Sequence, residues 1–171
     1  MQTFPQYTRF IHFIKTGELG LINHQMSKEK IKAMLGRPFN ILDVYEGQSG
    51  KPEILTYQYK NLSIVFHNSK LVFLSIEFKS SLMGLPKELK IKWYEEVSQL
   101  TLKTFIEIIK TEKLSCERRY EPALVGDNVM LWLPKGRIEA LFLPDTEFKL
   151  WKLTAASTSI GTGKWETTNC Y

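Results

Sequence analysis

The chain has 171 residues and a net charge of +5, with 43% apolar and 24% charged residues, values that are ordinary for a globular protein. This apolar content supports a core without disulfide staples, and no run approaches the roughly 18 apolar residues of a membrane span. The bases are scattered rather than gathered with exposed aromatics, which argues against a nucleic-acid partner, as at Lys28, Lys30, Lys32, Lys87, Lys90, Lys92 and Arg118–Arg119.

Two short helices are predicted near the start of the chain. Apolar residues at helical spacing favour a helix over residues 7–16, and Gly17 is a natural stop. Ser27 is a good N-cap for a second helix, because its hydroxyl accepts a hydrogen bond from an amide of the next turn. Gly36 ends that helix and Pro38 prevents its continuation.

Strands follow, and the clearest is the hairpin "YKNLSIVFHNSKLVFLSIEF" at residues 59–78. Its apolar residues alternate along both arms, and Asn68–Ser69 is a plausible two-residue turn. The segments "FNILDVYEG" and "EILTYQY" precede it as further strands. Residues 79–87 carry Ser, Gly and Pro, so we place a boundary between two halves there.

A long helical region is predicted from about residue 87 to 112. Its apolar stripe moves to nearly the opposite side of the helix partway along. Either the helix breaks near Thr101, or different neighbours cover its two ends. Four further strands are expected in "SCERRYEP", "NVMLWL", "RIEALFL" and "FKLWKLT", and residues 155–171 are expected to form an irregular tail.

The order of elements repeats, with helical segments followed by four strands in each half. We therefore predict an α+β fold of two pseudo-repeated units, each with helices packed on one face of its own antiparallel four-stranded sheet. The units are predicted at residues 1–80 and 81–154, followed by the tail at 155–171.

The first half resembles the outer-membrane-assembly lipoprotein family called SmpA or BamE. The resemblance covers residues 17–78 and rests on a Gly-rich lead-in, a Met-Ser helix start and a helix ending in "LGRP": Gly20, Met26, Ser27, Leu35, Gly36 and Pro38. The same unit in tandem is the architecture of β-lactamase inhibitor protein, and the hairpin is similar to those of immunity-type proteins. The resemblance implies protein binding by a sheet surface without catalysis. The chain departs from the lipoproteins in lacking a lipobox cysteine at its start.

No catalytic or metal-binding pattern stands out in the sequence. His12, His24 and His67 fall in different elements, and none has another metal ligand at the proper spacing within its own element. Cys116 becomes a nucleophile only if folding brings a histidine beside it. We therefore expect no catalytic residue, no metal and no cofactor, with an enzyme using Cys116 or a histidine as the alternative.

The two cysteines lie far apart, and Cys170 is one residue from the end of the chain. Two reduced thiols are expected, which favours a reducing compartment. The first residues also lack the basic and apolar regions of a secretory signal. We therefore expect a cytoplasmic protein, with an envelope assembly factor as a further alternative.

Aromatic residues on the strands are the predicted binding surface. The candidates are Tyr57, Tyr59, Phe73, Trp132 and Trp151, with the two tryptophans ranked first. Aromatic side chains are favoured anchors at protein interfaces. The alternative for each is that helices or the tail cover it as part of the core. We predict a non-enzymatic module of inhibitor or immunity type that binds another protein through an exposed aromatic sheet face.

Overall fold

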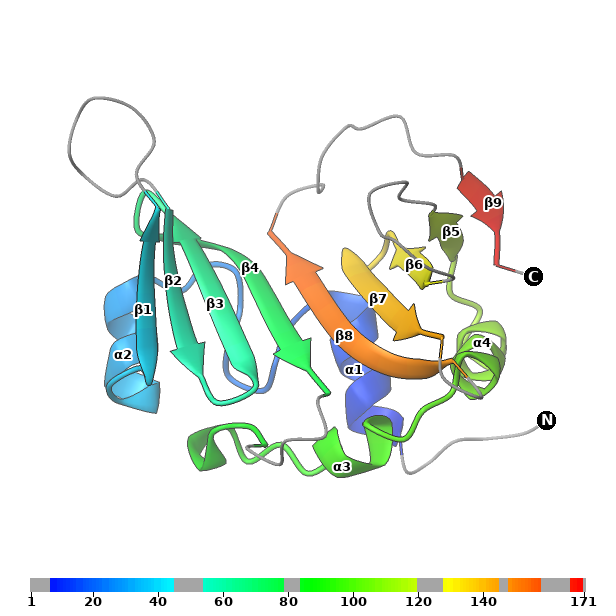
Figure 1. Ribbon diagram of the computed structural model, residues 1–171, viewed down its shortest axis with the longest axis horizontal. Helices are drawn as coiled ribbons and strands as arrows, with labels where there is room; N and C mark the ends of the chain where they lie inside the picture. The colour runs from blue at the N-terminus through cyan, green and yellow to red at the C-terminus, as the bar shows by residue number, and fades with distance from the viewer. Residues whose placement is uncertain are drawn as a thin grey trace.

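The computed structural model describes residues 7–44, 54–78, 84–119, 128–144, 148–157 and 167–170. Within them, nine strands form one antiparallel sheet in the order β1-β2-β3-β4-β8-β7-β6-β5-β9 (Figure 1). The strands are β1 (Asn40–Val44), β2 (Ile54–Tyr59), β3 (Leu62–His67), β4 (Lys70–Glu77), β5 (Glu117–Arg119), β6 (Val129–Leu133), β7 (Ile138–Leu143), β8 (Lys149–Ala156) and β9 (Thr167–Asn169). The helices are α1 (Thr8–Thr16), α2 (Lys28–Leu35), the 3₁₀ helix η2 (Lys87–Leu89), α3 (Tyr94–Val97) and α4 (Leu102–Thr111). The α+β class with an antiparallel sheet is confirmed.

The caps predicted for the first two helices are confirmed. Gly17 follows α1 in the left-handed conformation, and its N–H donates to the carbonyl of Phe13. The Ser27 hydroxyl accepts from the backbone N–H of Lys30 at the start of α2. Gly36 closes α2, and its N–H donates to the carbonyl of Lys32.

The long helical region breaks at Thr101, so the first of the two alternatives is confirmed. Thr101 is extended, and its hydroxyl accepts a hydrogen bond from the backbone N–H of Thr104. This cap starts α4 in a new direction, and α4 buries Phe105, Ile108 and Ile109. The shift of the apolar stripe therefore marks separate helices rather than one helix with two neighbours.

The hairpin predicted at residues 59–78 is present as β3 and β4, but the expectation of two pseudo-repeated units, each with its own four-stranded sheet, is wrong. β4 pairs with β8 in antiparallel register, with Ile76 opposite Leu153, so one sheet runs through the whole fold. Two separate sheets would each leave an edge of unpaired N–H and C=O groups at this point. Joining β4 to β8 satisfies both edges. The division of the chain into residues 1–80, 81–154 and 155–171 stays a prediction.

The contacts of α1 also differ from those expected if the chain formed two separate units. Phe10 lies against Trp93 and Phe105, with ring centroids 5.4 and 6.0 Å apart. Lys15 forms an ion pair with Glu112, with 2.7 Å between Nζ and Oε2. The first helix of the chain therefore packs on residues from its second half, and Figure 1 shows α1 behind β8.

One face of the sheet carries most of the core. Leu62, Ile64 and Phe66 alternate along β3 and are buried, whereas Ser63 and Val65 between them point to the other face and are half-buried. Figure 1 shows α2 behind β1 and β2 on the same side as α1. The strands thus divide the molecule into a helix-covered face and an opposite face, which we call the open face. Among the described residues, no helix is long and apolar enough to cross a membrane.

The prediction of two reduced thiols is wrong. Cys116 and Cys170 form a disulfide, with Cα atoms 5.6 Å apart. They flank β5 and β9, which pair with Glu117 opposite Asn169, so the next position brings the two cysteines together. The tail is therefore not irregular at residues 167–169, and Ala155–Ala156 belong to β8. Residues 158–166 and 171 of the predicted tail lie outside the described residues.

Candidate functional site

Tyr57 and Tyr59 lie on the helix-covered face of β2 and are buried. The Tyr59 hydroxyl donates to the carbonyl of Gly36 at the end of α2, at 3.1 Å. Burial raises the pKa of Tyr59 to about 12, because the ionised phenolate would lose its hydration, and the nearby Tyr57 adds to the rise. Tyr59 therefore helps to hold the end of α2 to the sheet, and the rings of both predicted binding residues are buried.

Trp132 is only 6% exposed, although it lies on the open face of β6. The guanidinium of Arg119 stands 4.3 Å from the centre of its ring. Neighbouring positions on the same face are also buried: Met130, Leu141 and Ala156. Trp132 is thus part of a second buried apolar group rather than an exposed anchor.

Phe73 and Trp151 remain partly exposed, but the structure does not bring them together. Phe73 pairs with Ala156, which is five residues along β8 from Trp151, or about 16 Å at the usual rise of a strand. The five predicted aromatics therefore do not form one continuous surface.

A polar row crosses the open face instead, and sequence reasoning missed it. Each of its residues is directly opposite the next on the neighbouring strand, and opposite residues share a face. Two contacts along it are hydrogen-bonded: Asn40 with Gln58 at 3.2 Å and Ser75 with Thr154 at 3.1 Å. The row runs Asn40, Gln58, Ser63, Ser75, Thr154, Glu139, is interrupted by Trp132 and ends at Glu117.

The strongest candidate for a binding surface is the edge of the sheet at β1. In the described part of the sheet, β1 pairs with β2 and has no strand on its other side. Phe39 is 80% exposed, Ile41 48% and Leu42 46%. Exposed edges of natural sheets are usually protected by charge, proline or a bulge, so three exposed apolar residues here are unusual. We call Phe39, Ile41 and Leu42 the β1 edge patch.

The backbone of β1 also has an N–H group that could bond to a further strand. The backbone N–H of Ile41 donates to the side-chain Oδ1 of Asn40 at 2.9 Å. Asn40 in turn donates through Nδ2 to the side chain of Gln58 on β2. A side-chain acceptor is easily displaced by the carbonyl of an incoming strand, which would give the Ile41 amide a backbone partner.

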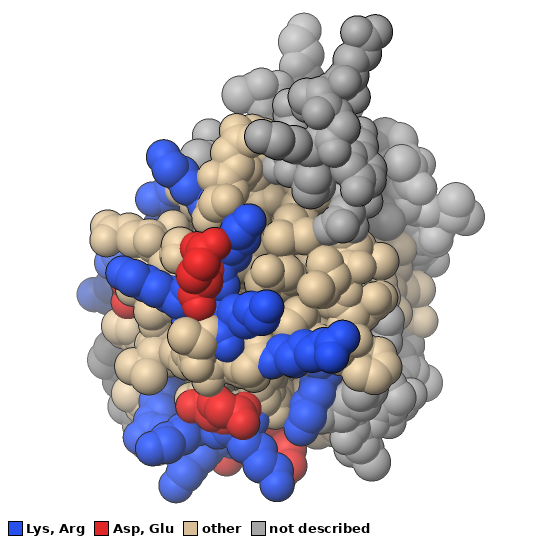
Figure 2. Space-filling view, turned by 90° about the vertical axis from the view of Figure 1, so that its left-hand side faces the viewer, with Lys and Arg blue, Asp and Glu red and all other residues tan. Residues whose placement is uncertain are grey.

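Basic side chains surround this edge. Residues 28–37 hold four bases and one acid, and Lys30, Lys32 and Arg37 are exposed. Figure 2 views the molecule from the side of β1 and α2, and shows Lys and Arg gathered beside a surface that is mostly uncharged. The edge therefore combines an apolar patch with a positive surrounding.

The described residues do not assemble an enzymatic centre from the sequence candidates. The sulfur of Cys116 is bonded to Cys170, so it is not a free thiol that could act as a nucleophile. His12 and His67 are exposed, and His12 lies 3.8 Å from the carboxylate of Glu18. Within the part of the chain that the structure describes, no three His, Cys, Asp or Glu side chains are placed to hold a metal.

His24 has a shifted pKa. Burial lowers its pKa below the ordinary 6.5, the charge of Arg137 lowers it further, and Glu18 opposes the shift. Both ring nitrogens are buried without a hydrogen-bond partner among the described residues. The neutral imidazole thus fits the fold better than the charged one.

A pH dependence of stability follows from this histidine. The unfolded chain binds a proton to His24 more readily than the fold does, so its stabilising contribution is complete above pH 6.5 and is lost as the pH falls through the lower pKa of the fold. We expect the free energy of unfolding to decrease between about pH 7.5 and about pH 5.5. Urea denaturation of the wild type and of a His24→Gln variant tests this. The variant should show the smaller decrease, and equal decreases would contradict the assignment to His24.

Comparisons with protein-family models, with curated proteins and with solved structures find no match to this chain. The resemblance to the SmpA or BamE family therefore stays a prediction. The candidate site rests on the geometry of the β1 edge alone.

Proposed function

We propose that the chain is a non-enzymatic protein-binding module that takes an extended, acidic segment of another protein along β1. The observation that carries the proposal is the exposure of Phe39, Ile41 and Leu42 at an edge of the sheet. Inhibitor-type or immunity-type action, in which the module occupies a surface of a target protein, is the form of binding that we favour.

An edge strand suits this role for a physical reason. A peptide added to an edge gains main-chain hydrogen bonds along its length, and side chains beside the edge select its sequence. Ile41 and Leu42 point to opposite faces of the sheet, so apolar side chains on either face of an added strand find a partner. Phe39, at the start of β1, supplies the large aromatic anchor that interfaces favour.

Charge selects the partner. The module has a net charge of +5, and residues 28–43, from α2 into β1, hold four bases against two acids, Glu29 and Asp43. A second copy of the chain would bring the same positive charge to the edge, whereas an acidic strand would be attracted to it. An acidic segment of a different protein is therefore favoured over self-pairing.

We also propose that the module works in an oxidising compartment. The expectation of a cytoplasmic protein rested on two reduced thiols and on the absence of a signal-like segment in the first residues, and the Cys116–Cys170 disulfide removes the first of these grounds. Disulfides persist in secreted and periplasmic proteins and are rare in the cytosol. This observation favours the alternative of an envelope protein over a cytoplasmic one.

A designed peptide tests the proposed edge. A fluorescein-labelled peptide of alternating valine and glutamate, about seven residues long, matches a typical strand. We expect its fluorescence polarisation to rise on adding the wild-type protein. The Phe39→Ser/Leu42→Ser double variant should weaken binding by about tenfold or more, because it removes apolar area from the interface.

The matched control is Leu21→Ser, which removes another exposed apolar residue, in the loop between α1 and α2. It should leave binding unchanged. A peptide of alternating valine and lysine should bind much more weakly than the acidic one. Equal affinity of the double variant and Leu21→Ser would overturn the proposed site, and concentration-dependent dimers of the wild type in sedimentation would favour a second copy as the occupant.

A further inference from the structure

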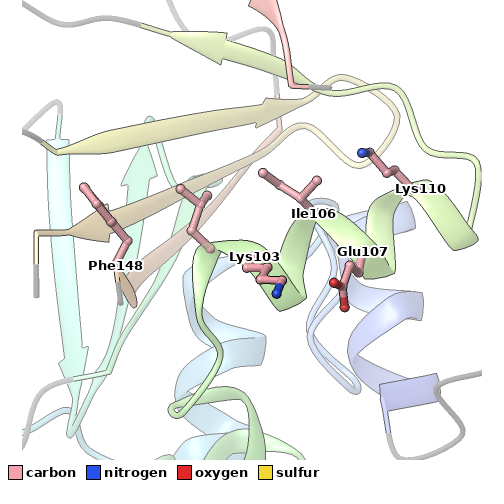
Figure 3. Close-up of a pocket in the computed structure, with 6 residues that line it drawn as sticks. Lys103, Ile106, Glu107, Lys110 and Phe148 are labelled. Atoms are coloured by element: carbon pink, nitrogen blue, oxygen red, sulfur yellow. The ribbon is translucent and has the colours of Figure 1, made fainter. Parts of the chain in front are cut away.

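A pocket of about 510 Å³ lies between α4 and the start of β8, away from the β1 edge (Figure 3). Its size is within the range of small-molecule sites. It is lined by Leu102, Lys103, Ile106, Glu107, Lys110 and Phe148. Figure 3 shows Ile106 and Lys110 on the side of α4 toward the strands, and Lys103 and Glu107 on the side away from them.

The lining is mainly apolar. Leu102, Ile106 and Phe148 are each partly buried and pack against the edge of the core. The parts of these three side chains that remain exposed line the pocket. An alkyl chain placed along Ile106 and Phe148 would remove this apolar surface from water, which is favourable in proportion to the area covered.

The position of Phe148 is fixed by the backbone around it. Its φ is +51°, in the left-handed region that bulky residues rarely adopt. The carbonyl of Phe148 accepts from the N–H of Leu102, and the N–H of Leu150 donates to the carbonyl of Leu100, both at 2.9 Å. These bonds hold the aromatic ring beside the first turn of α4, so this wall of the pocket is preformed.

The charged groups favour an anion at the N-terminal end of α4. Lys103 lies in the first turn of α4, where the helix dipole adds a partial positive charge beside its ammonium, while the N–H groups of Leu102 and Thr104 are already bonded to Phe148 and Thr101. Glu107 is one turn further on and Lys110 another, so the rim holds two lysines and one glutamate. The net charge of the rim is positive, and its most favourable point for an anion is beside Lys103.

We propose that this pocket binds a free medium-chain carboxylate, with its carboxylate at Lys103 and its alkyl chain over Ile106 and Phe148. The proposal does not depend on the β1 edge. Octanoate is the probe, and methyl NMR of Leu102 and Ile106 is the measurement. We expect saturable shifts of these methyl signals, with a Kd of about 1 mM, as is usual for a ligand of this size.

Variants of the pocket distinguish the contribution of the carboxylate to octanoate binding from that of the alkyl chain. Lys103→Glu should weaken octanoate binding by about fivefold, since an exposed charge contact is modest and its reversal adds repulsion. Lys92→Glu changes an exposed lysine outside the pocket and should leave binding unchanged. Ile106→Gln should weaken binding by about fivefold or more through loss of apolar contact. Circular dichroism checks that each variant is folded.

Three outcomes would overturn the proposal. The first is equal binding of octyltrimethylammonium, which has the same tail with a cationic head. The second is equal octanoate affinity for Lys103→Glu and Lys92→Glu. The third is binding to phosphatidylglycerol vesicles with no methyl shift from octanoate, which would assign the pocket to a membrane lipid instead of a free carboxylate. Acetate, which has the head without the tail, should cause no saturable shift.

Discussion

Replacing Gly136 with alanine should lower the free energy of unfolding by about 3–4 kcal/mol, or the melting temperature by about 10 °C. Gly136 lies in the turn between β6 and β7, where a Cβ atom would stand 2.2 Å from the backbone carbonyl oxygen of Ile14 in α1. No side-chain rotation relieves a contact with backbone, so α1 or the turn has to move. Thermal and urea denaturation measure the loss.

The same two segments meet at a second glycine. A Cβ on Gly17, just after α1, would lie 2.8 Å from the carbonyl oxygen of Gly136. The end of α1 and the β6–β7 turn therefore approach each other closely enough to exclude side chains from both backbones. This contact joins the first helix of the chain to the second half of the sheet, so the Gly136 variant tests how α1 is docked.

Gly36→Ala is the matched control. Gly36 has a positive φ, +77°, which Gly136 does not have, and a Cβ at Gly36 meets nothing within 4 Å. Its substitution should cost about 1–3 kcal/mol of conformational strain, because φ +77° with ψ −157° lies in a region nearly confined to glycine. If Gly136→Ala cost no more than Gly36→Ala, the docking of α1 against the β6–β7 turn would be contradicted.

Removing the disulfide should lower the free energy of unfolding by about 3–4 kcal/mol. The bond closes a loop between residues 54 apart in sequence, and restricting the unfolded chain over such a length is worth roughly this much. The double variant Cys116→Ser/Cys170→Ser should show the loss in urea denaturation. It leaves no thiol for mispairing, because the chain has only these two cysteines.

Reduction of the wild-type disulfide with dithiothreitol provides a second test of this prediction, for comparison with the double variant. Wild-type protein in dithiothreitol should lose about the same stability as the double variant, and the double variant should not respond to the reagent. A thiol assay on the native, non-reduced protein should find no free cysteine. Two free thiols per chain, with wild-type stability unchanged by dithiothreitol, would contradict the disulfide.

The features that the sequence predicted well are those set by near neighbours. The cap at Ser27, the stop at Gly17 and the break at Thr101 each depend on a hydrogen bond spanning three or four residues. The Asn68–Ser69 turn is equally local, since both residues have the positive φ that tight hairpin turns require. Such signals are visible in a short stretch of sequence without knowledge of the remaining fold.

The pairing of distant strands was not predictable in this way. β4 and β8 are more than 70 residues apart, and nothing in either strand marks the other as its neighbour. The polar row across the open face depends on the register of every pair, so it becomes visible only when the strands are aligned. The pairing of β9 with β5 likewise places Cys170 beside Cys116, although Cys170 lies near the end of the chain.

The residues of the β1 edge patch, which we propose bind a partner, were not predicted for a related reason. Alternation correctly placed Tyr57 and Tyr59 on one face of β2, but it cannot tell which face the helices cover. Phe39, Ile41 and Leu42 look like residues of an ordinary buried strand. Their exposure follows from the position of β1 at the edge of the sheet, and strand order is a property of the assembled fold.

The measurement that most directly tests the proposed function is hydrogen–deuterium exchange with and without the valine–glutamate peptide. An added strand would accept hydrogen bonds from the outward amides of β1, so we predict slower exchange within residues 39–44 and little change elsewhere. The Phe39→Ser/Leu42→Ser variant should lose this protection. Protection of β4 and β8 around Phe73 and Trp151 instead, or unchanged exchange in residues 39–44 with the peptide bound, would contradict binding at the β1 edge.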